Sequence, residues 1–183
     1  MQKSPSEAGR WLAVSAIGAN QDGLALDLVR SIQERGCTIL DSRIVPLGRS
    51  LSASFLVSGN WSALGRLETA LPALAERLGL KINYHRTEPG SSEPQFRPYA
   101  VEVVAPQRGD LLVQLLDFFR GQDVVVSEVV TQNYASSHTG AAMCNLHLVV
   151  NVPIDQHPQA MRDSFMDLCD ELNADGVLDP IKS

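Results

Sequence analysis

The sequence predicts an α+β protein built from two similar domains, each with four strands and two helices. Two observations support this fold class: the chain repeats itself, and each repeat alternates between the apolar spacing typical of strands and that typical of helices. Residues 11–43 and 98–130 align without gaps at one constant offset, which places Asp41 with Glu128. Two homologous domains are the simplest interpretation.

A polar segment between the repeats marks the expected domain boundary. It is rich in Pro, Gly and Ser, a composition typical of an exposed linker rather than of a packed element. We therefore expect a first domain at 10–88, a linker at 89–96 and a second domain at 97–183.

The first domain begins with a weak alternation of apolar and polar residues over 12–17, which predicts a strand that ends at Gly18. A helix with one buried face follows, and Gly36 suits its C-terminal end because glycine readily adopts the left-handed conformation. Residues 37–47 and 51–58 are then expected to form a hairpin. The apolar residues that predict the helix are Leu24, Leu28, Val29 and Ile32.

The second helix of the first domain carries leucines at helical spacing over 64–78, but Pro72 lies among them. Because proline lacks a backbone N–H and clashes with the preceding turn, we expect a kink or break near Leu71 and a restart at Pro72. Residues 80–86 form the fourth expected strand.

The second domain repeats this pattern, so both domains have the element order βαββαβ. With right-handed crossovers, that order gives a four-stranded antiparallel sheet with both helices on one face, which is a ferredoxin-like fold. The strands expected in the second domain are 99–105, 124–132, 140–152 and a short one from Val177, and the expected helices are 110–120 and 159–174.

Composition and charge exclude several classes of protein. Of the 183 residues, 44% are apolar and 20% are charged, which is ordinary for a folded globular chain and excludes disorder. The formal net charge is −6, and residues 91–183 alone carry −8, from 5 basic and 13 acidic side chains. A chain that repels phosphate overall does not suit direct binding to nucleic acid.

The cysteines and the hydropathy pattern bear on cofactors and location. Cys37, Cys144 and Cys169 are far apart and form no Cys-x-x-Cys pair, so neither a disulfide framework nor a thiolate metal site is indicated. No segment approaches the roughly 18 consecutive apolar residues of a spanning helix, and no targeting peptide is evident. We expect a cytoplasmic protein with no cofactor, no metal and no membrane segment.

The residues expected on the sheets favour neither RNA binding nor catalysis. RNA-recognition modules of this fold stack bases on aromatic side chains of the first and third strands, whereas alternation places Phe55 in the core. Glu102 and His147 fall on neighbouring strands and could form an acid/base pair, but hydrogen bonding on a sheet surface is the commoner role. We expect a protein without enzymatic activity.

The loop before the first helix is the candidate ligand-binding site: Asn20, Gln21, Asp22, Gly23 and Leu24. A helix N-terminus presents unpaired N–H groups and a positive dipole end to an anion, and Gly23 allows close approach to the backbone. Simple N-capping, in which Asn20 or Asp22 accepts a backbone N–H, is the alternative. In the second domain, Asp110 at the matching place is expected to cap its helix or to supply a favourable charge at the positive end of the helix dipole.

This loop resembles the motif of the ACT domain, a regulatory ferredoxin-like unit that binds amino acids. The family motif is roughly Asp-x-Pro-Gly followed by aliphatic residues; Gly23 and Leu24 match it, whereas Asn20 and Asp22 replace the aspartate and the proline. Over about 11–176 the chain is also similar to the glycine cleavage system transcriptional repressor family of tandem ACT regulators. The runs that carry this similarity are Gly36-Cys37 with Ile39, Asp41-Ser42-Arg43, Ser58-Gly59-Asn60-Trp61, Phe165, Leu168-Cys169, Glu171-Leu172-Asn173-Ala174 and Gly176.

The resemblance implies a cytoplasmic antiactivator that restrains a DNA-binding activator of the glycine cleavage operon by protein contact, and it implies that glycine relieves this restraint. The acidic face expected on the last helix could steer a basic partner surface. A different class of function stays open, namely an interaction module without ligand sensing. Such a module would form a homodimer or dock on a metabolic enzyme through an exposed sheet face that carries Ile17, Leu56 and Val104.

Overall fold

The computed structural model describes residues 10–88 and 96–181. The chain divides into two compact units, Met1–Ser91 and Ser92–Ser183. The linker expected at 89–96 lies, except for Phe96, outside the described residues, so the proposed domain boundaries stay a prediction.

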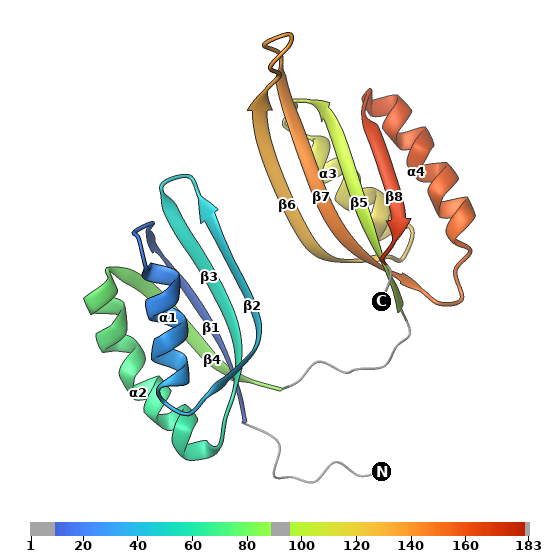
Figure 1. Ribbon diagram of the computed structural model, residues 1–183. Coiled ribbons are helices and arrows are strands. Elements are labelled where there is room, and N and C mark those ends of the chain that lie inside the picture. The colour runs from blue at the N-terminus through green and yellow to red at the C-terminus, as the bar shows by residue number, and fades with distance from the viewer. Residues whose placement is uncertain (1–9, 89–95, 182–183) are drawn as a thin grey trace. The chain divides into compact units, whose positions relative to one another are not determined.

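The first unit is a four-stranded antiparallel sheet in the order β2-β3-β1-β4, so that the first and third strands are neighbours. Both helices lie on one face of the sheet (Figure 1). The elements are β1 (Trp11–Ala19), α1 (Leu24–Gln33), β2 (Thr38–Leu47), β3 (Ser50–Ser58), α2 (Trp61–Leu78) and β4 (Leu80–Thr87).

The second unit has the same topology, with strand order β6-β7-β5-β8 and two helices on one face (Figure 1). The predicted βαββαβ fold is therefore confirmed for both halves of the chain. The elements are β5 (Phe96–Pro106), α3 (Leu111–Gly121), β6 (Val125–Ala135), β7 (Ala142–Pro153), α4 (Pro158–Leu172) and β8 (Asp175–Pro180).

The same irregularity interrupts the second strand of both sheets. In β2 the pairing with β3 shifts between Ile39 and Asp41, and in β6 the pairing with β7 shifts between Val126 and Glu128. Each shift inserts one extra residue, a β-bulge, and beyond it the alternation of side chains continues with the opposite parity.

The break expected at Pro72 does not occur, and α2 is continuous from Trp61 to Leu78. Pro72 itself is exposed, whereas Leu67, Leu71 and Leu74 on both sides of it are buried. Packing of these leucines against the sheet keeps the helix continuous through Pro72 and offsets the loss of one backbone hydrogen bond.

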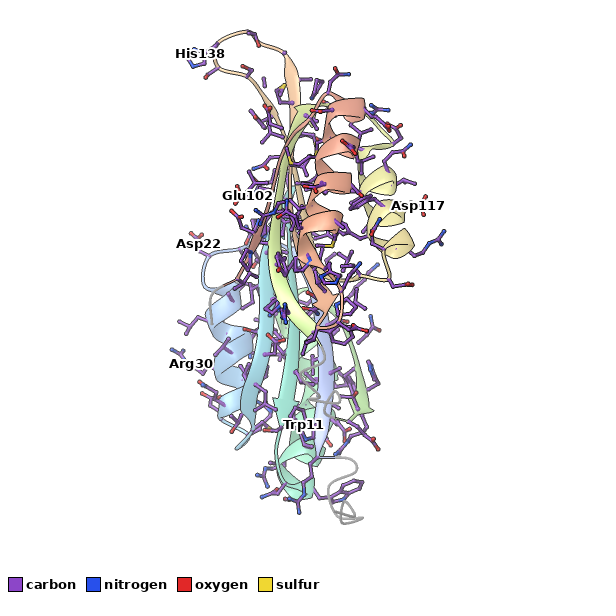
Figure 2. All side chains as sticks on the ribbon, turned by 90° about the vertical axis from the view of Figure 1, so that its right-hand side faces the viewer. Trp11, Asp22, Arg30, Glu102, Asp117 and His138 are labelled. Atoms are coloured by element: carbon purple, nitrogen blue, oxygen red, sulfur yellow. The ribbon has the colours of Figure 1, made fainter. Side chains whose placement is uncertain are left out.

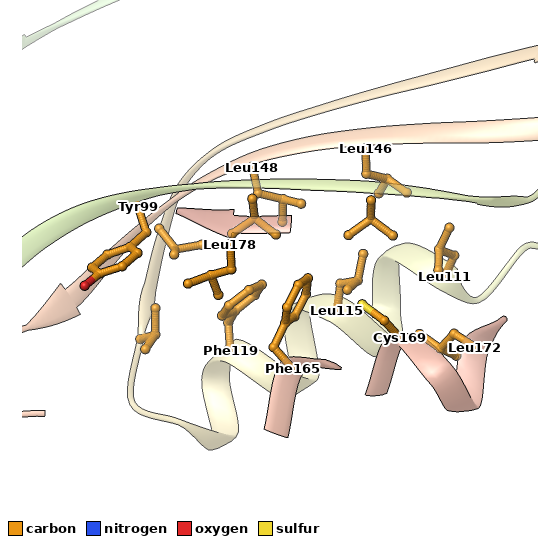
Figure 3. Close-up of a cluster of buried hydrophobic side chains, with 14 of the residues drawn as sticks. Tyr99, Leu111, Leu115, Phe119, Leu146, Leu148, Phe165, Cys169, Leu172 and Leu178 are labelled. Atoms are coloured by element: carbon orange, nitrogen blue, oxygen red, sulfur yellow. The ribbon is translucent and has the colours of Figure 1, made fainter. Parts of the chain in front are cut away.

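Each unit has its own core between its sheet and its helices. In the first, Phe55 is buried, as its alternation predicts, and it is not available to stack on a base. In the second, the ring centroids of Phe119 and Phe165 lie 6.0 Å apart in a stacked arrangement (Figure 3). All three cysteines are buried.

Several residues that carry the family resemblance have structural roles. The Asn60 side chain caps α2 by accepting a hydrogen bond of 2.8 Å from the N–H of Ala63. Asn173 ends α4 in the left-handed conformation, with φ of 51°. Gly176 lies so close to the core that an added Cβ would be 2.3 Å from Cys169 Sγ. These residues therefore specify the fold rather than a binding site.

Candidate functional site

The loop before α1 is an exposed turn held by backbone hydrogen bonds. The N–H of Asn20 donates to the carbonyl of Arg49 at 2.9 Å, and the N–H of Leu24 donates to the carbonyl of Gln21 at 3.2 Å. Gly23 occupies the N-cap position with φ of 81°, a conformation that favours glycine. Figure 2 shows Asp22 on this loop, next to the N-terminus of α1.

The capping alternative is wrong for this loop, because no side-chain hydrogen bond caps α1 in the described part of the chain. The N–H of Leu24 donates to the carbonyl of Gln21 instead, so neither Asn20 nor Asp22 caps the helix through its side chain. An added Cβ at Gly23 would meet no atom within 4 Å, so the backbone here is open to approach. Ligand contact at Asn20, Gln21, Asp22, Gly23 and Leu24 stays a prediction.

The corresponding loop of the second unit is built differently. Asp110 occupies the N-cap position of α3, but its side chain makes no capping hydrogen bond and instead accepts two from Arg108, at 2.6 and 2.7 Å. The expected side-chain cap by Asp110 is therefore wrong, whereas the alternative, a favourable charge at the positive end of the helix dipole, stays a prediction. The hydrogen bonds from Arg108 hold the pKa of the Asp110 carboxyl below its usual range. A hollow of about 480 Å³ lies beside this loop, next to Thr131 and Asn133 of β6.

A second hollow, of about 330 Å³, lies on the face of the first sheet that is turned away from the helices. Its lining includes Asp41 and Arg43 of β2, which contact one another as an ion pair, and none of the five predicted loop residues. In the sequence the Asp41-Ser42-Arg43 run was a mark of family resemblance, and for Arg43 it left open a pair across the hairpin, a cross-domain contact or a ligand contact. Alternation along β1 and β3 could have indicated that Ser15 and Ser54 share this face.

The Glu102 and His147 pair lies where the sequence placed it, but its geometry suits a surface contact. The two residues are paired across β5 and β7, with His147 Nδ1 3.8 Å from Glu102 Oε1. The His147 side chain is 42% exposed and the Glu102 side chain is 67% exposed. Figure 2 shows Glu102 on the side of the second sheet away from α4. At this distance no direct hydrogen bond forms, and no enclosed site surrounds the pair.

The cysteines are not placed for metal binding or nucleophilic chemistry. Among residues 10–88 and 96–181, no group of three or more His, Cys, Asp or Glu side chains could hold a metal ion. Burial, together with Asp170 and Asp175, raises the pKa of the Cys169 thiol to about 11. Within the same ranges, no helix has the length and hydropathy needed to cross a bilayer.

The comparisons with known proteins agree with this architecture. Residues 10–85 match the family model of the ACT domain. Over 171 residues the chain is 26% identical to the glycine cleavage system transcriptional repressor of Escherichia coli K12, which covers 93% of this chain and 90% of that protein. The same protein from Shigella flexneri matches equally well.

Two solved structures share the whole architecture. One is the crystal structure of a protein whose assignment as a glycine cleavage system transcriptional repressor is provisional. It matches with a TM-score of 0.71 and 25% identity, over 94% of this chain and 98% of that chain. A protein of unknown function from Galdieria sulphuraria has a TM-score of 0.75 at 20% identity, over 94% and 99% of the chains, and shows the fold alone.

Both units thus have the fold of the ACT domain, and the ACT-domain family model itself matches the first of them. Over nearly its whole length, the chain is similar to proteins named glycine cleavage system transcriptional repressors, which is the resemblance that the sequence motifs indicated.

Proposed function

We propose that this protein is an amino-acid-responsive regulator that restrains a DNA-binding activator of the glycine cleavage operon by protein contact, with glycine as the ligand. The observation that supports this most strongly is the similarity to named transcriptional repressors across 93% of the chain. Those relatives are regulators rather than enzymes, and the exposed Glu102 and His147 pair offers no enclosed catalytic site.

The charge of the chain supports action through a protein rather than directly on DNA. The net charge is −6, and the second half contributes −8. Phosphate neutralisation by Lys and Arg supplies most of the affinity in non-specific DNA binding, so this chain lacks the required surface charge. A regulator of transcription with this charge is better suited to a basic protein that itself binds DNA.

The exposed face of α4 is the best candidate for electrostatic steering of such a partner. Met161, Phe165 and Leu172 on the opposite face of α4 are buried, which leaves the acidic face in solvent. Attraction between exposed charges weakens with salt, because the Debye length is about 8 Å at physiological ionic strength. The exposed acidic residues are Asp163, Asp167, Asp170 and Glu171.

The proposed contact with a DNA-bound activator can be tested by a gel-shift assay with operator DNA from the glycine cleavage operon. The protein alone should leave the DNA unshifted, whereas addition of the activator should give a complex that this protein changes. The association between the two proteins should weaken at least tenfold between 50 and 300 mM salt, roughly as expected for exposed charge pairs. A shift by this protein alone, or salt-independent association, contradicts the proposal.

The proposed ligand site is the loop Asn20, Gln21, Asp22, Gly23 and Leu24. The ligand carboxylate would accept hydrogen bonds from backbone N–H groups at the start of α1, where no side-chain cap competes with it. To regulate, glycine must bind one conformation of the protein more tightly than another, because equal affinity for both shifts no equilibrium.

Calorimetric titration of the full chain with glycine, alanine, serine and larger amino acids tests this site. Gly23→Ala should lower glycine affinity at least tenfold, because the left-handed conformation and the close approach are both lost. Gly140→Ala is the matched control, since Gly140 also has a positive φ, of 70°, and no atom within 4 Å of an added Cβ, but lies in the β6–β7 turn of the second unit. Absence of binding by every amino acid, or equal effects of the two substitutions, contradicts ligand sensing at the loop.

The interaction module without ligand sensing is supported by one observation, the exposed apolar side chain of Ile17 on the outward sheet face, which is 44% exposed. Co-purification of a metabolic enzyme instead of an activator, together with no response to any amino acid, would favour that function.

A further inference from the structure

We propose that the first unit carries a second small-molecule site, the hollow on the outward face of its sheet, which binds a free α-amino acid through Arg43 and Asp41. This inference rests on the proposed amino-acid response, but it assigns a site separate from the loop before α1. The hollow measures about 330 Å³, at the lower end of the roughly 300–1,000 Å³ typical of small-molecule sites.

The β-bulge in β2 brings the two charged side chains to this face. Ile39 pairs with the core residue Val57, and the extra residue then lets Asp41 pair with Leu56 on the outward side. Arg43 follows two residues later and shares that face, because side chains alternate along a strand. The first row across the sheet is Arg43, Ser54, Ser15 and Asn83, and the second is Asp41, Leu56, Ala13 and His85.

Small side chains take three of the four central places in these rows and create the hollow. Ser15, Ser54 and Ala13 lie beside Leu56 on the two central strands, whereas longer polar side chains stand on the edge strands β2 and β4. The floor therefore offers hydroxyl groups, each of which can donate and accept a hydrogen bond. Convergent polar groups around a depression are the usual construction of a site for a small polar ligand.

The charges at the rim match those of an amino acid. Arg43 Nη1 contacts the Asp41 carboxylate and also donates to the carbonyl of Ser42 at 3.0 Å. The side chains of Arg43 and Asp41 are 56% and 58% exposed, and ion pairs this exposed contribute little to stability, so their rearrangement costs little. A ligand carboxylate would bind the guanidinium, and a ligand ammonium would bind Asp41, so that both charges keep an opposite partner.

The second unit provides an internal comparison. The places of Ser15 and Ser54, which pair with one another, are taken there by Glu102 and His147, which also pair. A longer carboxylate and an imidazole side chain thus stand where the first sheet has hydroxyl groups. The place of Arg43 is taken by Val130, so the cation that would hold a carboxylate is lost. The proposed site therefore belongs to the first unit alone.

Calorimetry on the full chain with the same panel of amino acids tests the site. Arg43→Gln should lower the affinity of the best ligand at this site at least tenfold, whereas Arg30→Gln, which removes an exposed cation from α1, should leave it unchanged. The double substitution Ser15→Glu with Ser54→His transplants the pair of the second sheet and should abolish binding. Circular dichroism and thermal midpoints should show that every variant folds.

The outcomes separate this inference from the loop proposal. Loss of one binding event in Arg43→Gln, with a ligand-induced change in the amide signals of Ser15 and Ser54 by NMR, supports the sheet-face site. Binding that is lost only in Gly23→Ala refutes the sheet-face site and keeps the loop. Absence of amino-acid binding by the unmodified protein refutes both sites. Binding that is lost in the sheet-face variants but kept in Gly23→Ala refutes the loop site alone.

Discussion

Replacement of Gly176 by alanine should destabilise the second unit by about 1–3 kcal/mol, the usual cost of overpacking a well-packed core. The added Cβ would lie 2.3 Å from Cys169 Sγ and 2.9 Å from Phe165 Cε1. Favourable contacts between heavy atoms begin at about 3.5 Å, so the sulfur must move by about 1 Å. Cys169 is 1% exposed and Phe165 is 0% exposed, which leaves neither side chain an empty space to enter.

Denaturation by guanidinium chloride, followed by far-UV circular dichroism and by tryptophan fluorescence, would measure this cost. Both tryptophans, Trp11 and Trp61, lie in the first unit, so the fluorescence transition should not move. Gly121→Ala, also in the second unit and with no atom within 4 Å of the added Cβ, is the control; because it lies in α3, where alanine is favoured over glycine, it should leave stability unchanged or raise it by up to about 1 kcal/mol.

A double-mutant cycle identifies the contact responsible. In a Cys169→Ala background the sulfur is absent, so Gly176→Ala should cost less than it does in the unmodified protein. Equal costs in the two backgrounds, or a Gly176→Ala protein as stable as the unmodified one, would refute the steric argument.

Three further predictions concern the first unit and the buried thiols. Arg86 donates two hydrogen bonds to Glu68, which lower the pKa of that carboxyl. The pair should therefore contribute about 0.5–1 kcal/mol to the free energy of unfolding at neutral pH. This contribution is lost as the pH falls from about 4.5, the usual pKa of the carboxyl, through its lower pKa in the folded protein. Glu68→Gln should lower urea stability at pH 7 but not at pH 3, and an equal deficit at both values would contradict this. Asn60→Ala should cost about 0.5–2 kcal/mol through the lost cap of α2, and no change in the fluorescence transition would exclude that role. Burial raises the pKa of every cysteine thiol, so a thiol reagent at pH 8 should modify none of them until the protein unfolds. Rapid modification of the native protein, measured by mass spectrometry, would show that the cores open.

The order of the elements could be predicted from the sequence because periodicity of two or of 3.6 residues reports directly which side chains are buried. Phe55 was correctly assigned to the core for this reason. Pro72 was wrongly expected to break α2, because local backbone preference gives way to the burial of leucines on both sides.

The site was harder to predict because side-chain partners depend on tertiary geometry. Asp110 has the residue type and position of a cap, yet Arg108 competes for its carboxylate. The sheet-face hollow requires Ser15, Ser54 and Arg43 to be neighbours across three strands. The predicted topology gives the strand order, but that proximity also requires the register and the bulge at Leu40, which a single sequence does not give.

The bulges in β2 and β6 have a consequence for the history of the chain. Leu40 and Ser127 are the extra residues, and they are separated by the same offset that relates the two repeats. An insertion of one residue inverts every side chain beyond it, so it is tolerated only when the rest of the strand fits the new parity. Two independent insertions at the same place would need that coincidence twice. A single ancestral unit that already carried the extra residue, before its gene was copied and fused, is the more economical origin, and divergence has since changed the solvent-facing chemistry while leaving the backbone path intact.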